Sequence, residues 1–145
     1  MKNAATKLLA EHSIPLAVIT NLISTTLNIP DDSSSNISHG MIFVLLSGLL
    51  IAPFIETFVF QHIIYKAFYK KPSVYFISSI LLFYTIHIDG RGFFIALLPG
   101  LLGGANFSLC YFRANRMKLN AFMTTSLSHL LCNSLIIISA CLFWR

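Results

Sequence analysis

The chain has 145 residues, of which 56% are hydrophobic and 10% are charged, and its formal net charge is +5 at pH 7. Because a soluble domain has about 25% charged residues, this composition excludes an ordinary soluble domain, a disordered chain and a nucleic-acid-binding protein. A membrane-spanning helix needs about 20 apolar residues. The sequence therefore predicts one all-α domain over residues 1–145, a polytopic transmembrane bundle of about five spans.

The first apolar stretch is the weakest of the five. It runs from Ser13 to Ile29 and is interrupted by Pro15 and Asn21. A secretory signal peptide is disfavoured, because Glu11 adjoins the apolar stretch and no small-x-small cleavage site follows it. We expect either a poor first span or a helix that lies in the membrane interface.

Four stronger apolar stretches follow, and short polar connections separate them. Short connections make consecutive helices antiparallel neighbours. The fourth stretch contains Gly100 and Gly104 at GxxxG spacing, which allows two helices to approach closely in lipid. The four spans are predicted at residues 41–69, 72–88, 92–112 and 119–144.

Basic residues alternate between the loops. Eight of the ten Lys and Arg residues fall before the first stretch, after the second and after the fourth, and two fall after the third and fifth. The positive-inside rule then predicts a protein of the cytoplasmic (inner) membrane with its N-terminus in the cytoplasm and its C-terminus outside. The three cysteines form no metal or redox motif and are expected to be packing residues.

Glu56 is the only acidic residue inside a strong predicted span, because the other four lie at span ends or in loops. An intramembrane carboxylate costs about 2.5–3.5 kcal/mol on insertion scales, so such residues usually serve a function. The alternative is a structural hydrogen bond to a neighbouring helix.

Further polar side chains occur at a similar depth. His129 and Asn133 are four residues apart and share a helix face, which Thr125 extends by one turn. His87 ends the third stretch. Polar contacts between helices would explain any one of these residues. At a rise of about 1.5 Å per residue from the cytoplasmic end of each span, however, these side chains and Glu56 lie at overlapping depths in the bilayer. We therefore expect one site formed by spans two, three and five.

This set of side chains suits hydrolysis. A carboxylate can take a proton from the water that attacks a peptide carbonyl, and His and Asn side chains can stabilise the resulting oxyanion. No Ser or Cys nucleophile is needed. A zinc site built from Glu56, His87 and His129 is the less favoured alternative, because the chain has neither HExxH nor HxxxH. We expect no cofactor.

The same residues resemble the motifs of the CPBP family, which comprises CAAX-type intramembrane endopeptidases and bacteriocin-processing or self-immunity (Abi) proteins. The resemblance covers about residues 41–140. The family's Ala-Pro and EExxxR motif, its FxxxH motif and its HxxxN motif correspond to Ala52-Pro53 with Glu56, to Phe83 with His87, and to His129 with Asn133.

The resemblance implies a glutamic peptidase of the membrane without a metal cofactor. Glu56 would activate water with assistance from His87, and His129 and Asn133 would form the oxyanion site. The implied partners are the lipid bilayer and a peptide substrate, either a small bacteriocin-like precursor or the tail of a membrane protein.

Two positions depart from the EExxxR motif. Thr57 replaces the second Glu and Gln61 replaces the Arg, so that both members of an acid–base pair become neutral together. Such a replacement leaves no uncompensated buried charge. The replacement keeps open a second interpretation, in which the protein is a weak or inactive family member that acts as a membrane immunity or partner-binding protein. A proton-coupled carrier is a third possibility, disfavoured because no repeated halves are visible.

Overall fold

The structure is a computed structural model that describes residues 2–26, 46–88 and 97–143. Every element in these ranges is helical, which confirms the all-α prediction for this part of the chain. The α-helices and π-helical segments (η) are, in chain order, α1 (Lys2–Thr26), η2 (Ser47–Ile51), α3 (Ala52–Glu56), η3 (Thr57–Ile63), α4 (Ile64–Phe68), α5 (Pro72–Ile88), η4 (Leu97–Leu102), α6 (Gly103–Arg116) and α7 (Ala121–Phe143).

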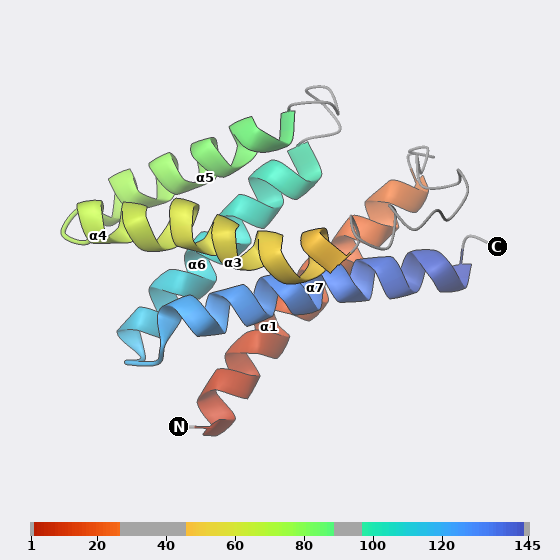
Figure 1. The fold of residues 1–145 in the computed structure, drawn as a ribbon, viewed down its shortest axis with the longest axis horizontal. Helices are drawn as coiled ribbons and strands as arrows, with labels where there is room; N and C mark the ends of the chain where they lie inside the picture. Colours follow the sequence, from red (N-terminus) through yellow and green to blue (C-terminus); the bar gives the residue numbers. More distant parts are fainter. Residues whose placement is uncertain (1, 27–45, 89–96, 144–145) are drawn as a thin grey trace.

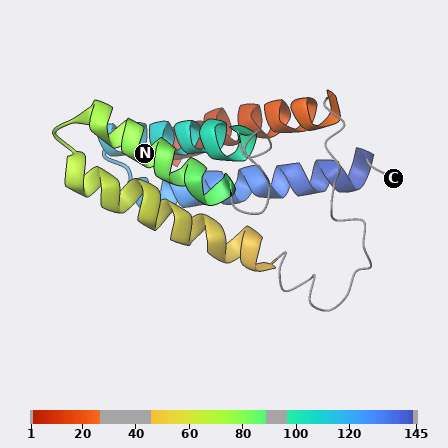
Figure 2. The same ribbon diagram turned by 90° about the horizontal axis from the view of Figure 1, so that it is seen from above.

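These elements join into continuous helical stretches, because η2, α3, η3 and α4 follow one another without a break, and so do η4 and α6. The 47–68 stretch runs between α5 and α7 (Figure 1). Viewed from above, α1 and the 47–68 stretch lie on opposite sides of α7 (Figure 2). The described part of the bundle therefore packs around α7, which contacts α1, α6 and the 47–68 stretch.

Two helices in the described ranges are long and apolar enough to cross a membrane, Ser47–Phe68 and Ala121–Ser139. A third apolar helix, Pro72–Ile88, has the bounds predicted from the sequence but is shorter. Large apolar side chains such as Leu50, Phe58 and Leu81 are exposed on the outside of the bundle. A surface of this kind fits contact with lipid rather than water.

The start of α1 differs from the prediction. The helix begins at Lys2 rather than at Ser13, and Pro15 lies inside it. Most of residues 2–10 are good helix formers, and the ion pair of 3.7 Å between Lys7 and Glu11, one turn apart, adds a small stabilisation to this part of the helix. The end of the predicted stretch, Ile29, lies outside the described residues.

Prolines accompany two of the π-helical segments. Pro53 follows η2 closely, and Pro99 lies within η4. Proline lacks the N–H of an α-helical hydrogen bond, and the N–H of Ala52 donates to the carbonyl oxygen of Ser47, five residues earlier. π-helical turns of this kind are frequent at functional sites. Glu56, the last residue of α3, lies between two of them.

The two glycines of the predicted GxxxG pair lie against α5. A Cβ added to Gly100 would lie 2.7 Å from Tyr84 Cδ2 and 2.9 Å from Tyr84 Cα, and one added to Gly104 would lie 3.2 Å from Phe83 Cβ. The predicted close approach of two helices is therefore confirmed. It places Phe83 in the interior of the bundle, where 1% of the residue is exposed.

Cys110 and Cys132 are free and buried, as the packing interpretation predicted. The side chain of Cys141 lies outside the described residues.

Two of the predicted basic connections lie at the same end of the bundle. Residues 69–71 join α4 to α5 and residues 117–120 join α6 to α7, on the left of Figure 1. This placement agrees with the predicted grouping of positive loops. The connections that carry Asp31, Asp32, Asp89 and Arg91 lie outside the described residues.

Candidate active site

Glu56 and His129 come together where α3 packs against α7. The distance between Glu56 Oε2 and His129 Nε2 is 3.7 Å, and the side chains are 20% and 6% exposed. This distance exceeds that of a hydrogen bond, so the two groups are adjacent without bonding directly in this conformation. Two of the four predicted catalytic residues thus form a contact pair of a carboxylate and an imidazole inside the helical bundle.

Aromatic rings hold the His129 imidazole from two other helices. Phe107 of α6 stacks on it with ring centroids 4.0 Å apart and an interplanar angle of 26°. Phe83 of α5 lies 5.8 Å away at a tilt of 52°. Because stacking restricts rotation of the imidazole plane, these two rings hold His129 in the orientation in which Nε2 faces Glu56.

His87 is joined to this group through Phe83. Its ring stacks on Phe83 at 4.6 Å, and its Nδ1–H donates to the Phe83 carbonyl oxygen at 2.8 Å. This hydrogen bond places the proton of a neutral imidazole on Nδ1 and leaves Nε2 as the basic nitrogen. The FxxxH spacing therefore has a physical role, because one phenylalanine packs against both predicted catalytic histidines.

Asn133 lies one turn beyond His129 on α7 and is half-buried. Its amide forms no hydrogen bond with any residue in the described ranges. Thr125, one turn before His129, is fully buried. The shared face of these residues is present, but direct contact with Glu56 is made by His129 rather than by Asn133.

Thr57 and Gln61 are both fully buried, so they share the inner side of the helix. The Thr57 hydroxyl and both amide atoms of Gln61 form no hydrogen bond within the described part of the protein, and neither does the buried hydroxyl of Ser126. The two side chains therefore do not bond to each other. Because buried polar groups are normally hydrogen-bonded, these unpartnered atoms are candidates for binding ordered water.

A second polar cluster, which joins α1 to α6, was not predicted. Asn106 Nδ2 donates to the His12 carbonyl oxygen at 2.8 Å, so Asn106 Oδ1 accepts from His12 Nδ1–H at 2.8 Å. Arg113 then donates to His12 Nε2 at 3.1 Å and to Glu11 Oε2 at 2.7 Å. The Arg113 hydrogen bond lowers the pKa of Glu11, and burial lowers the pKa of His12. No pattern in the sequence indicated this cluster, because Asn106 and Arg113 lie far along the chain from Glu11 and His12.

Within the described ranges, no group of three or more His, Cys, Asp or Glu side chains could hold a metal ion. The expectation of metal-free hydrolysis stays a prediction.

Comparison with known proteins identifies the family. A family model described as type II CAAX prenyl endopeptidase Rce1-like matches residues 38–135. No curated protein and no solved structure gives a significant match. The matched range contains all four predicted catalytic residues, and the family is one of membrane-bound proteases. The chain belongs to the Rce1-like family of type II CAAX prenyl endopeptidases.

Proposed function

We propose that this protein is an intramembrane peptidase in which Glu56 activates the hydrolytic water. The observation that carries the proposal is the 3.7 Å contact between Glu56 Oε2 and His129 Nε2 inside an apolar bundle. A carboxylate in such surroundings is costly. Here Glu56 can accept a proton, and the neighbouring imidazole of His129 can donate a hydrogen bond to the same reacting group.

The proposed reaction is direct attack of water on the peptide bond, without a covalent enzyme intermediate. Glu56 takes one proton from water while the water oxygen bonds to the carbonyl carbon of the scissile peptide. The N–H of His129 donates to the resulting oxyanion. The carbon–nitrogen bond then breaks, and the proton held by Glu56 passes to the departing amine. A new carboxyl terminus and a new amino terminus result.

His87 and Asn133 have supporting roles in this proposal. His87 Nε2 accepts a hydrogen bond from water or substrate, because Nδ1 is already engaged with the Phe83 carbonyl. Asn133 lies one turn from His129 on the same face and gives the oxyanion a second N–H donor. The substrate is a small peptide precursor or the tail of a membrane protein.

The membrane arrangement is part of the proposal. With the N-terminus in the cytoplasm, the basic turns 69–71 and 117–120 face the cytoplasm. Labelling of Lys70→Cys and Ser34→Cys with a membrane-impermeant maleimide tests this arrangement in intact cells and in inverted membrane vesicles. Lys70→Cys should react only in inverted vesicles and Ser34→Cys only in intact cells. The reverse pattern would contradict the proposed topology.

Cleavage by the purified full chain tests the catalytic proposal. The chain is reconstituted in lipid vesicles and incubated with peptides that end in a CAAX sequence, with and without an S-farnesyl group, and with unmodified peptide mixtures. Mass spectrometry should detect fragments with the native chain and with Glu11→Gln, a matched change outside the site. Glu56→Gln should cleave at least about 100-fold more slowly than the native chain, while it unfolds at the native temperature. Undiminished cleavage by Glu56→Gln would refute the role of Glu56.

The second candidate function is a membrane immunity or partner-binding protein of the same fold. Thr57 and Gln61 favour it, because they replace both charged members of the family motif with neutral side chains. It predicts that no probe is cleaved and that Glu56→Gln and His129→Ala retain function in cells. The peptidase proposal predicts that both variants lose function.

A further inference from the structure

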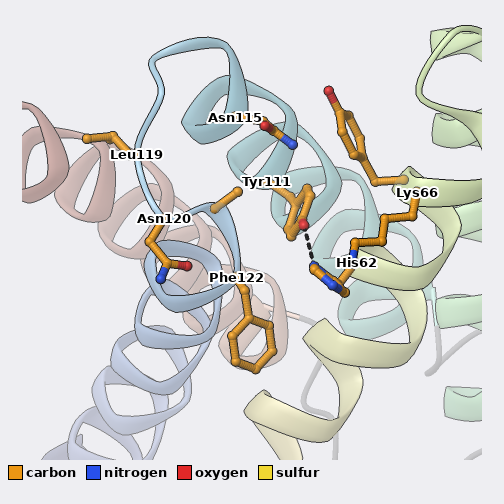
Figure 3. A pocket seen from close by; sticks show the side chains of 9 residues that line it. His62, Lys66, Tyr111, Asn115, Leu119, Asn120 and Phe122 are labelled. Atoms are coloured by element: carbon orange, nitrogen blue, oxygen red, sulfur yellow. Dashed lines mark hydrogen bonds between the residues drawn. The ribbon is translucent and has the colours of Figure 1, made fainter.

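A pocket of about 350 Å³ lies at the end of the bundle that carries the basic turns. Glu56 and His129 do not line it. Its walls come from the segment of His62 and Lys66, from α6 and from the start of α7 (Figure 3). Its volume is at the lower end of the range for small-molecule sites, roughly 300–1,000 Å³.

The polar groups of this pocket are suited to an anion. No acidic residue lines it, and the Lys66 ammonium forms no ion pair within the described residues. His62 Nδ1 and Tyr111 Oη share a hydrogen bond of 2.6 Å (Figure 3). Whichever atom donates, the pair keeps one further N–H or O–H for a ligand. The amide of Asn115 belongs to the same wall as Tyr111.

The start of α7 adds a second feature that favours an anion. The side chain of Asn120 accepts from the N–H of Met123 at 3.1 Å. The N–H groups of Ala121 and Phe122 lie in the first turn, where a helix offers no internal acceptor, and both residues line the pocket. The positive end of the dipole of α7, a helix of 23 residues, is therefore directed at the pocket.

The surroundings of the pocket indicate a lipid rather than a soluble anion. It lies near the end of the candidate span Ser47–Phe68, where lipid head groups would lie. The ring of Phe122, which lines the pocket, packs edge-on against Phe58, with centroids 6.3 Å apart. Phe58 is 49% exposed on the apolar surface of that span. An acyl chain joined to a phosphate in the pocket would continue along Phe58, a contact that a free phosphate cannot make.

We propose that the pocket binds the phosphate of an acidic phospholipid and thereby fixes α4, α6 and α7 at one membrane surface. Lys66 and the first turn of α7 neutralise the phosphate, and Phe122 and Phe58 contact the upper acyl chain. Basic pockets between transmembrane helices bind acidic head groups in this way.

Native mass spectrometry of the full chain tests this proposal. The protein is purified in detergent with equal amounts of phosphatidylglycerol and phosphatidylcholine, and the affinity for each lipid is obtained by titration. Loss of one lysine at the phosphate should weaken phosphatidylglycerol binding about five-fold in Lys66→Gln. Lys70→Gln is the matched control, because Lys70 is exposed on the adjoining turn and does not line the pocket.

The proposal predicts that one phosphatidylglycerol binds in preference to phosphatidylcholine. The affinity for phosphatidylglycerol should fall in Lys66→Gln but not in Lys70→Gln. Millimolar inorganic phosphate should not displace the bound lipid. Equal losses in Lys66→Gln and Lys70→Gln, or equal binding of phosphatidylcholine, would overturn it. Displacement of the lipid by inorganic phosphate would identify a soluble anion as the ligand and would overturn it as well. Peptide cleavage is not measured, so the result is independent of the proposed peptidase activity.

Discussion

The carboxylate of Glu56 and the imidazole of His129 meet 3.7 Å apart, although α5 and α6 separate their helices in the chain. Each side chain would be unfavourable alone in an apolar span. Together they form a polar centre that aromatic rings of α5 and α6 enclose. The packing of α3, α5 and α6 around His129 is therefore part of the site. Changes in that packing should alter the proposed catalysis.

The stacking of Phe107 on His129 predicts a positioning role for this phenylalanine. Phe107→Leu keeps an apolar side chain of similar size but removes the flat ring 4.0 Å from the imidazole. We expect kcat to fall about 10- to 100-fold, because small displacements of a catalytic group are costly, while KM changes little. Steady-state cleavage kinetics measure this split. An increase in KM at constant kcat would instead place Phe107 in substrate binding.

Gly100 is predicted to be essential for the packing of η4 on α5. Gly100→Ala places a methyl group 2.7 Å from Tyr84 Cδ2 and 2.9 Å from its backbone Cα, which cannot move aside. Overpacking of this kind should destabilise the protein by about 1–3 kcal/mol. Gly48→Ala is the matched control, since nothing lies within 4 Å of its Cβ. Thermal unfolding in detergent compares them, and equal unfolding temperatures would contradict the close approach.

The His12 cluster predicts lower stability in acid. Burial lowers the pKa of His12 from its ordinary value of 6.5, so the unfolded chain binds a proton more readily than the folded one. Stability from neutral His12 is therefore present above pH 6.5 and is lost as the pH falls through the lowered folded pKa. Protonation of His12 Nε2 would also remove the acceptor of the Arg113 hydrogen bond and place two positively charged groups next to each other.

The measurement for His12 is the unfolding temperature between pH 7.5 and 5. The native protein should lose more stability over this range than His12→Gln, whose side chain does not titrate. Glu11 contributes at lower pH, because its pKa is also lowered and its stabilising charge is lost only in stronger acid. Identical pH dependence of the native chain and His12→Gln would exclude a neutral, buried His12.

Gln61 is predicted to lower the stability of the fold. Its side chain is fully buried with no hydrogen bond to a described residue. An unsatisfied buried polar group costs about 1–3 kcal/mol, so Gln61→Leu should raise the unfolding temperature. If the Gln61 amide binds water that the reaction uses, the same variant should also lower the cleavage rate. A fall in both quantities would indicate an ordinary structural role for Gln61.

The sequence predicts α5 and the GxxxG contact well because both depend on local signals. Lys70, Lys71 and Pro72 mark where α5 begins, and an apolar run defines its length. The early start of α1 depends partly on Arg113, which lies far along the chain and bonds to Glu11. The π-helical segments have no distinct apolar period, and the stacking of Phe107 on His129 is a tertiary contact. The sequence therefore singled out Glu56, His129 and the ring of Phe83, but gave no signal for the stacking of Phe107 on His129.

A double-mutant cycle of Glu56→Gln and His129→Gln tests most directly whether the two residues act as one catalytic unit. Single-turnover cleavage by the reconstituted chain, with enzyme in excess, measures the small rates that remain. Each variant alone should lose roughly 10²- to 10⁴-fold in rate. The rate of the double variant should lie within about three-fold of the rate of the slower single variant, because losses within one catalytic unit are not additive. Losses that multiply would contradict a shared role.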